Sequence, residues 1–87
     1  MILNKYTIFD SKLEAYHQDY SLENDALALR QFADMANEEA QIAKNPEDYS
    51  LWRIGTFETT TGELTPEEPT CIAKAHEHVI QFKKNKK

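Results

Sequence analysis

The sequence predicts a small α+β protein, in which two or three helices pack on one face of a small antiparallel sheet made of two hairpins. Two runs of the chain, residues 3–9 and 50–58, are rich in the aromatic and β-branched residues that favour strands. Between them, residues 25–38 carry apolar side chains at helical spacing. Short segments with turn residues separate these elements, as is typical of one layer of sheet and one of helices.

The length and composition indicate one ordinary globular domain. The chain has 87 residues, of which 40% are hydrophobic and 29% are charged, and a domain of this size needs a compact core. We expect a single α+β domain over residues 1–82 and a basic C-terminal tail over residues 83–87. No window approaches the roughly 18 apolar residues of a membrane helix, and the first ten residues lack the pattern of a secretory signal. We therefore expect no membrane contact.

The N-terminal part predicts a hairpin. The run LNKYTIF at residues 3–9 has no glycine or proline and fits a half-buried strand. Asp10, Ser11 and Lys12 form a turn, and LEAYH at 13–17 alternates apolar and polar residues as a short second strand.

A helix over 25–38 follows this hairpin. Asn24 is placed to cap its first turn, and Asp25 lies where the helix dipole favours a carboxylate. The segment EEAQIAK either continues the helix or forms a second one after a break near Asn37, and Pro46 ends it.

A second hairpin is predicted over the next part of the chain. SLWRIGTFE at 50–58 is the strongest strand, and its mixed faces suggest a central position with packing on both sides. Gly62 suits the left-handed position of the following turn, and Pro66 and Pro69 are expected to end the returning strand. Residues 70–80 then have apolar residues at helical spacing after Thr70, which predicts a terminal helix.

The stretch NPEDYSLWRIG contains two residues that need a specific explanation. Gly55 marks either a bulge or a close approach of another backbone. Arg53 stands in the middle of an apolar strand, and pairing with a carboxylate is its simplest explanation.

The charge is unevenly distributed along the chain. Residues 1–82 hold six basic and fifteen acidic residues, so their net charge is six minus fifteen, or −9. Four lysines in the last five positions (Lys83, Lys84, Lys86 and Lys87) form a basic tail. Because phosphate binding depends on Lys and Arg, the acidic body argues against wrapping a nucleic-acid backbone.

The residues that could carry chemistry do not form a recognisable site. Cys71 is the single cysteine, so an internal disulfide is excluded. On a helix, His76 and His78 would point about 200° apart and could not share a zinc ion. We expect a small buried cysteine with one packed and one solvated histidine, and we expect no metal and no cofactor. Phosphate loops, nucleophile elbows and H-E-x-x-H pairs are missing from the sequence.

Aromatic residues offer the best candidate for a binding surface. Bases of single-stranded nucleic acids stack on such side chains when they line a sheet. We expect Trp52 and Phe57 in the core, and Tyr16 and Tyr20 to be exposed. The candidate nucleic-acid contacts are Lys5, Tyr16, Tyr20, Arg53, Lys83, Lys84, Lys86 and Lys87.

Three stretches of the chain carry a resemblance to a known family. They are YTIFDSKLEAY, NDALALRQFADMAN and IAKNPEDYSLWRIGTFETTTGEL. Their order and spacing are similar to those of the small nonstructural protein of gokushovirus-type microviruses, the product of their fifth reading frame. The match covers residues 5 to about 66 and brings no catalytic motif with it.

The resemblance implies a nonenzymatic phage protein in the cytoplasm of an infected bacterium, acting in single-stranded DNA genome synthesis or packaging. It would bind DNA or a viral replication or procapsid component, and from its size we expect a homodimer. The alternative is an acidic host-directed protein that mimics DNA charge with Asp25, Asp34, Glu38 and Glu39. A small metal-dependent nuclease is a weaker third reading, because the sequence shows no ligand set.

Overall fold

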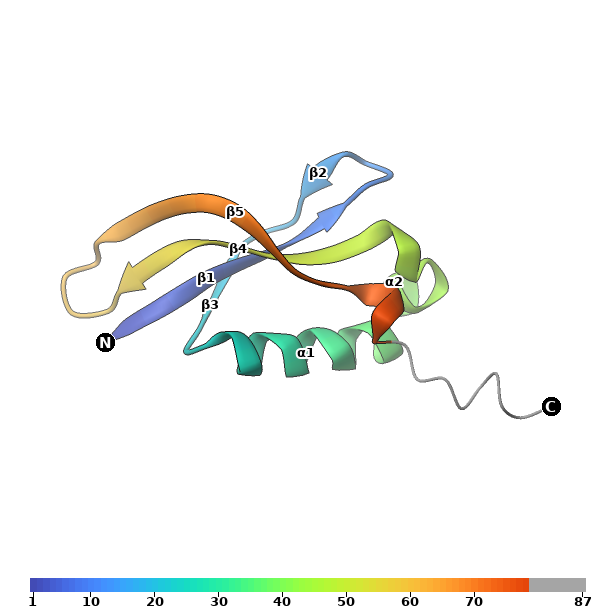
Figure 1. Ribbon diagram of the computed structural model, residues 1–87, viewed down its shortest axis with the longest axis horizontal. Helices are drawn as coiled ribbons and strands as arrows, with labels where there is room; N and C mark the ends of the chain where they lie inside the picture. Colours follow the sequence, from blue (N-terminus) through green and yellow to red (C-terminus); the bar gives the residue numbers. More distant parts are fainter. Residues whose placement is uncertain (79–87) are drawn as a thin grey trace.

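A computed structural model describes residues 1–78, which form one antiparallel sheet with helices on one of its faces (Figure 1). The predicted α+β class is therefore confirmed. The described elements, in chain order, are β1 (Ile2–Asp10), β2 (Ala15–Tyr16), β3 (Tyr20–Leu22), α1 (Asp25–Glu38), α2 (Ala40–Lys44), a 3-10 turn (Pro46–Asp48), β4 (Tyr49–Glu58), β5 (Leu64–Lys74) and a second 3-10 turn (Ala75–Glu77). The domain boundary expected at residue 82 lies outside the described residues.

The sheet is built around the pairing of β1 with β4. Its strand order is β2-β1-β4-β5, and β3 also pairs with β1. Both predicted hairpins are present, since β1 pairs with β2 and β4 pairs with β5. The strand β3 was not predicted, because three residues are too short a run to show a period.

Helix α1 begins and ends where the sequence predicts. The Asn24 side chain accepts a hydrogen bond from the Leu27 backbone N–H at 2.9 Å, which confirms the cap. The helix stops at Glu39, whose extended backbone separates it from α2. Asn45 then ends α2 directly before Pro46.

The core lies between α1 and the sheet. From the helix it receives Ala28, Phe32 and Ala36, all fully buried, and from the sheet it receives Tyr6 and Leu51. These residues lie on one side of their strands because side chains alternate between the two faces.

The expected terminal helix is wrong. β5 continues as far as Lys74 and is followed by a single 3-10 turn, while Val79 and Ile80 lie outside the described residues. The reason is a tertiary contact, because β4 pairs with β5 from Phe57 back to Ser50. This pairing satisfies the backbone polar groups of β5, and it outweighs the preference for a helix that the spacing of apolar residues indicates.

The prolines of β5 also do not end the strand, as the sequence had suggested. β5 pairs with β4 alone and is an edge strand of the described sheet, where prolines are tolerated. Glu67, Glu68 and Pro69 lie opposite Ile54 in a register shift. Pro66 is still in register opposite Gly55, and the bulge contains Pro69 before pairing resumes at Thr70.

An ion-pair and hydrogen-bond network ties the start of α1 to the sheet. The Tyr6 hydroxyl donates to Asp25, and Arg53 donates to the other oxygen of the same carboxylate. Arg53 also contacts Glu67 of β5 at 3.4 Å. The expectation that Arg53 pairs with a carboxylate is thus confirmed, and the residue links α1, β4 and β5.

We expect this network to make folding sensitive to high pH. Burial and the hydrogen bond to Asp25 raise the pKa of Tyr6 from 10.0 to about 12. The folded protein therefore favours the neutral phenol, so this stabilisation is complete below pH 10.0 and is lost as the pH rises through about 12. Urea unfolding at a series of alkaline pH values measures the loss.

The control for this prediction is Tyr6→Phe, in which the hydroxyl is removed and the ring is kept. Its stability should fall less between pH 10.0 and about 12 than that of the parent protein. Part of the alkaline loss of stability should remain in Tyr6→Phe, because burial also raises the pKa of Tyr20 and the pKa of Tyr49. An identical alkaline loss in parent and variant would contradict the assignment to Tyr6.

Candidate functional site

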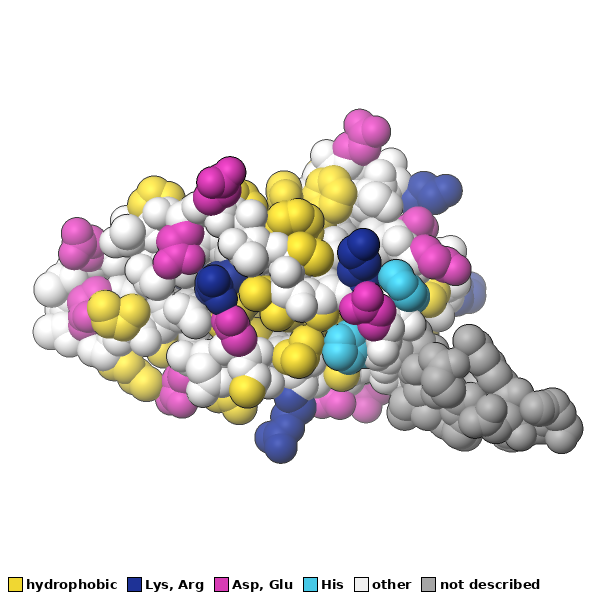
Figure 2. Space-filling view, viewed as in Figure 1, with side chains coloured by type: hydrophobic (Ala, Val, Ile, Leu, Met, Phe, Trp, Pro, Cys, Tyr) yellow, Lys and Arg dark blue, Asp and Glu magenta, His cyan; other side chains and the backbone are white. Residues whose placement is uncertain are grey.

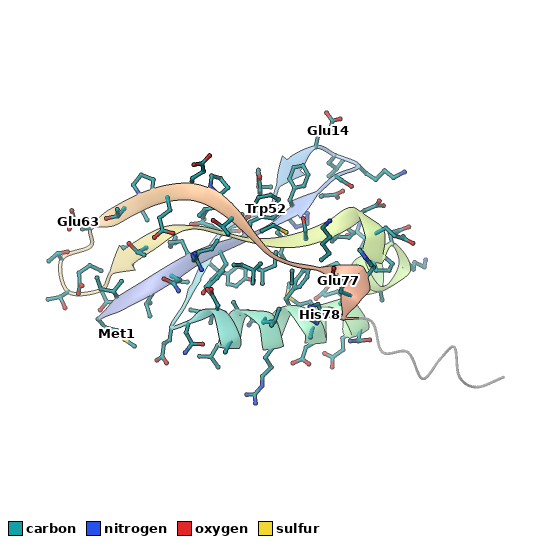
Figure 3. The ribbon with its side chains drawn as sticks, in the orientation of Figure 1. Met1, Glu14, Trp52, Glu63, Glu77 and His78 are labelled. Carbon is teal, nitrogen blue, oxygen red and sulfur yellow. The ribbon has the colours of Figure 1, made fainter. Side chains whose placement is uncertain are left out.

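The face of the sheet opposite α1 is the candidate functional site. Tyr6 and Arg53 both reach Asp25 of α1, so the residues next to them along each strand point the other way. None of the described helices covers this side, on which Figure 3 places Trp52. We call it the open face, and its residues include Lys5, Thr7, Phe9, Tyr16, Trp52, Ile54 and Phe57.

A row of three aromatic rings crosses the open face. The ring centroids of Phe9 and Tyr16 are 4.7 Å apart, and those of Tyr16 and Trp52 are 6.3 Å apart with the rings perpendicular. Tyr16 is 48% exposed, while Phe9 and Trp52 are half-buried. The Trp52 indole N–H donates to the Ser50 hydroxyl at 2.8 Å, which fixes its ring. The row is an aromatic surface that is partly open to solvent.

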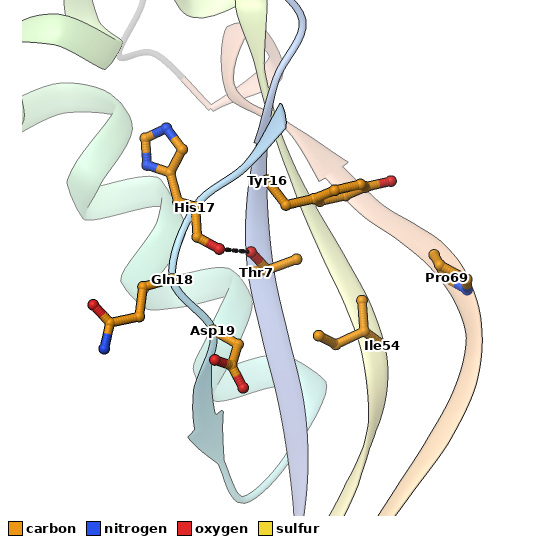
Figure 4. A pocket seen from close by; sticks show the side chains of 7 residues that line it. All are labelled: Thr7, Tyr16, His17, Gln18, Asp19, Ile54 and Pro69. Atoms are coloured by element: carbon orange, nitrogen blue, oxygen red, sulfur yellow. Dashed lines mark hydrogen bonds between the residues drawn. The ribbon is translucent and has the colours of Figure 1, made fainter. Parts of the chain in front are cut away.

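Beside this row the open face is hollowed (Figure 4). A hollow of about 390 Å³ is lined by Thr7, Tyr16, His17, Gln18, Asp19, Ile54 and Pro69. The Thr7 hydroxyl donates to the His17 backbone carbonyl at 2.6 Å, which holds the segment between β2 and β3 against β1. Because of this bond, the wall of the hollow is anchored to the sheet.

One ion pair lies on the open face near its middle. Lys5 Nζ is 2.8 Å from Asp19 Oδ2 and 5.8 Å from the centroid of the Phe57 ring. The hydrogen bond from Lys5 lowers the pKa of the Asp19 carboxyl. Asp19 is therefore a carboxylate at neutral pH.

The structure separates the predicted nucleic-acid contacts. Lys5 and Tyr16 lie on the open face, whereas Arg53 points toward α1. Tyr20 also lies on the helix side, where its ring is 6.2 Å from that of Tyr6 and packs against the core. The expectation that Tyr20 is exposed is wrong, because its pairing with Tyr6 puts both on the same face. Lys83, Lys84, Lys86 and Lys87 lie outside the described residues.

The expectation that Trp52 and Phe57 fill the core is also wrong. Both are half-buried and lie on the open face. There the Trp52 ring is near the Tyr16 ring, and the Phe57 ring is near Lys5 Nζ. The predicted packing on both sides of β4 is not found in the part of the chain that the structure describes. The alternation of Leu51, Trp52 and Arg53 is the signal that could have shown this, once Leu51 is assigned to the core.

The cysteine and the two histidines near the end of the described chain do not form a site. Cys71 is exposed, which corrects its expected burial: it follows Trp52 onto the open face of edge strand β5. The His78 ring meets Phe32 edge-on, whereas His76 is exposed. Within residues 1–78, no group of three or more His, Cys, Asp or Glu residues could hold a metal ion.

Figure 2 shows the molecule from the side, with the sheet and α1 both in view as in Figure 1. On this side, hydrophobic side chains gather near the middle and acidic side chains lie mostly around them.

A comparison with known families gives a match over most of the chain. A model of the family described as "Phage ORF5 protein" matches residues 3–78. The chain belongs to the phage ORF5 protein family. This confirms the resemblance to a small phage reading-frame product. No curated protein and no solved structure matches the chain significantly. Among the described residues of this phage ORF5 protein, no helix has both the length and the apolar character of a membrane span.

Proposed function

We propose that this phage ORF5 protein acts without catalysis in the synthesis or packaging of a single-stranded DNA genome, by binding single-stranded DNA on the open face. The single observation that supports the proposal is the row formed by Phe9, Tyr16 and Trp52 on a face that none of the described helices covers. Bases present a flat π surface whatever their identity, so such a row suits a strand of any sequence. The protein would work in the cytoplasm of an infected bacterium, as expected for a microvirus factor.

We assign base stacking to the open face and phosphate contacts to the tail, because the two differ in charge. Lys5 is already paired with Asp19, so the middle of the open face offers little net charge to phosphates. We assign the phosphate contacts to the lysines of the tail, which would draw the strand onto the aromatic row. Stacking would then provide the part of the affinity that salt does not screen.

We expect Tyr16→Ala to weaken single-stranded DNA binding about tenfold, because stacking on one aromatic contributes roughly 1–3 kcal/mol. Fluorescence anisotropy of labelled single-stranded and double-stranded DNA at low and moderate salt measures the affinity. A protein ending at Phe82 should bind more weakly and depend less on salt, since it lacks the tail lysines.

The matched control for Tyr16 is Leu13→Ala, which also removes a large exposed side chain near the first hairpin. Leu13→Ala should leave the affinity unchanged within about twofold, a difference of roughly 0.4 kcal/mol. The proposal is overturned by a protein that binds neither DNA at low salt, or by a Tyr16→Ala protein that binds as well as its parent.

A second candidate is the host-directed acidic protein, supported by the net charge of −9 over residues 1–82. Asp34, Glu38 and Glu39 of the acidic helix face are exposed. Asp25 is different, because its carboxylate is occupied by Tyr6 and Arg53. Failure to bind DNA together with retention of a host DNA-processing protein in a pull-down would favour this candidate. The homodimer remains a prediction under both candidate functions.

A further inference from the structure

A second hollow adjoins the one beside Tyr16, and we call the two hollows together the groove. The second hollow has a volume of about 150 Å³ and is lined by Lys5, Asp19, Ile54, Gly55, Leu64 and Pro66. Asp19 and Ile54 line both hollows. The larger volume, about 390 Å³, lies within the range of sites that hold small ligands.

One wall of this groove offers a flat aromatic ring. Figure 4 shows the Tyr16 side chain extending across β1 toward β5, on the same side as Ile54 and Pro69. His17 and Gln18 point the other way. A planar ligand in the groove would therefore meet Tyr16, Ile54 and Pro69 with its faces.

The polar groups of the groove are a carboxylate and an ammonium next to each other. Asp19 Oδ2 is 2.8 Å from Lys5 Nζ, and 46% of the Asp19 side chain is exposed against 18% of the Lys5 side chain. A carboxylate has about four lone-pair sites, and an ammonium has three donors. Both groups can therefore bind a ligand while they remain paired. The pair presents acceptors beside donors.

We infer that this groove binds a guanine base of single-stranded DNA, with its ring against Tyr16 and its Watson–Crick edge on the Asp19 and Lys5 pair. Asp19 would accept hydrogen bonds from the guanine N1–H and N2 amino groups, and Lys5 would donate to O6. Of the four bases, guanine alone has two adjacent donors followed by an acceptor on this edge, so it matches a carboxylate beside an ammonium best. The inference deepens the proposed function and rests on it.

The test uses oligonucleotides of thymine that contain isolated guanines, which avoids guanine-rich structures. In a second oligonucleotide, hypoxanthine replaces guanine and removes the N2 amino group. In a third, 7-deazaguanine replaces guanine and leaves the Watson–Crick edge intact. We expect the parent protein to bind the guanine and 7-deazaguanine strands at least about fivefold more tightly than the hypoxanthine strand.

Asp19→Asn and Glu14→Gln make a matched pair of variants for this test. Each removes one negative charge from an exposed residue of the β1 to β3 region, but Glu14 lies at the tip of the first hairpin and does not line the groove (Figure 3). We expect Asp19→Asn to reduce the preference for guanine over hypoxanthine to less than twofold. Glu14→Gln should keep it.

The outcomes separate the inference from the proposed function. Measurable binding with equal affinity for all three strands would overturn the guanine site and leave the proposed function standing. A guanine preference that survives in Asp19→Asn would also overturn it. Binding to none of the strands would overturn both, and a control strand of thymine alone identifies that case.

Discussion

Replacement of Gly55 by alanine is expected to reduce the free energy of unfolding by about 2–3 kcal/mol. A Cβ at this position would lie 2.4 Å from the Thr65 backbone oxygen and 3.2 Å from Pro66 Cα. Both are backbone atoms of β5, so no side chain can rotate to relieve the contact. Relief requires β4 and β5 to separate where Gly55 pairs with Pro66. The expectation of a bulge or close approach at Gly55 is confirmed, because both are present.

The other glycine of the chain provides the comparison. Gly62 has φ +78 and has nothing within 4 Å of the place where a Cβ would stand. Gly62→Ala therefore costs only the left-handed backbone conformation, about 1–2 kcal/mol. Urea unfolding followed by the fluorescence of Trp52 measures both variants. An unchanged stability of Gly55→Ala would show that β5 can move away from β4 at no cost.

Gly55→Ala also tests whether the groove depends on the contact between β4 and β5. Gly55 and Pro66 both line its second hollow. Movement of β5 would change the position of Pro66 relative to Lys5 and Asp19. At a temperature where Gly55→Ala remains folded, we therefore expect a weaker preference for guanine than in the parent.

Phe32→Ala is expected to have the largest effect on stability, a loss of about 3–5 kcal/mol. Phe32 is fully buried, and the other fully buried residues of α1 are Ala28 and Ala36. Phe32 is therefore the largest side chain that α1 buries completely against the sheet. Since small domains are stable by only 5–15 kcal/mol in total, the variant should be close to unfolding.

Two further variants keep this prediction testable even when Phe32→Ala does not fold. Phe32→Leu retains most of the volume and should lose about 1.5 kcal/mol or less. Gln31→Ala changes the exposed neighbour on the same helix and should stay within about 0.5 kcal/mol of the parent. Equal stabilities of Phe32→Leu and Phe32→Ala would contradict the role of the ring volume.

The sequence predicted local elements well where the local signal and the tertiary contacts agree. Helix α1 has the predicted range of 25–38, with Asn24 as its cap. The turn at Gly62 has the predicted positive φ of 78°. In each case the decisive interaction lies within a few residues, so the sequence contains it.

The candidate site was harder to predict, because it depends on which face of each strand is covered. Trp52 and Phe57 have the composition of core residues, and they lie on the open face since α1 covers the opposite side. The pairing of Asp19 with Lys5 depends on how the segment between β2 and β3 runs along β1. Alternation along β4 indicates the face of Trp52 once Leu51 is assigned to the core, whereas the pairing of Asp19 with Lys5 has no signature in the spacing of residues.

The sequence by itself determined the α+β class, the first helix with its cap, the two hairpins and the need of Arg53 for a carboxylate partner. Periodicity and turn residues act within a few positions of the chain, and burying an unpaired charge is costly at any position. Only the tertiary structure decided that residues 70–74 form a strand, that Tyr20 packs inward and that the groove lies on the open face. The physical reason is that backbone pairing with β4 and burial under α1 are contacts between distant segments, and they override local preference where the two conflict.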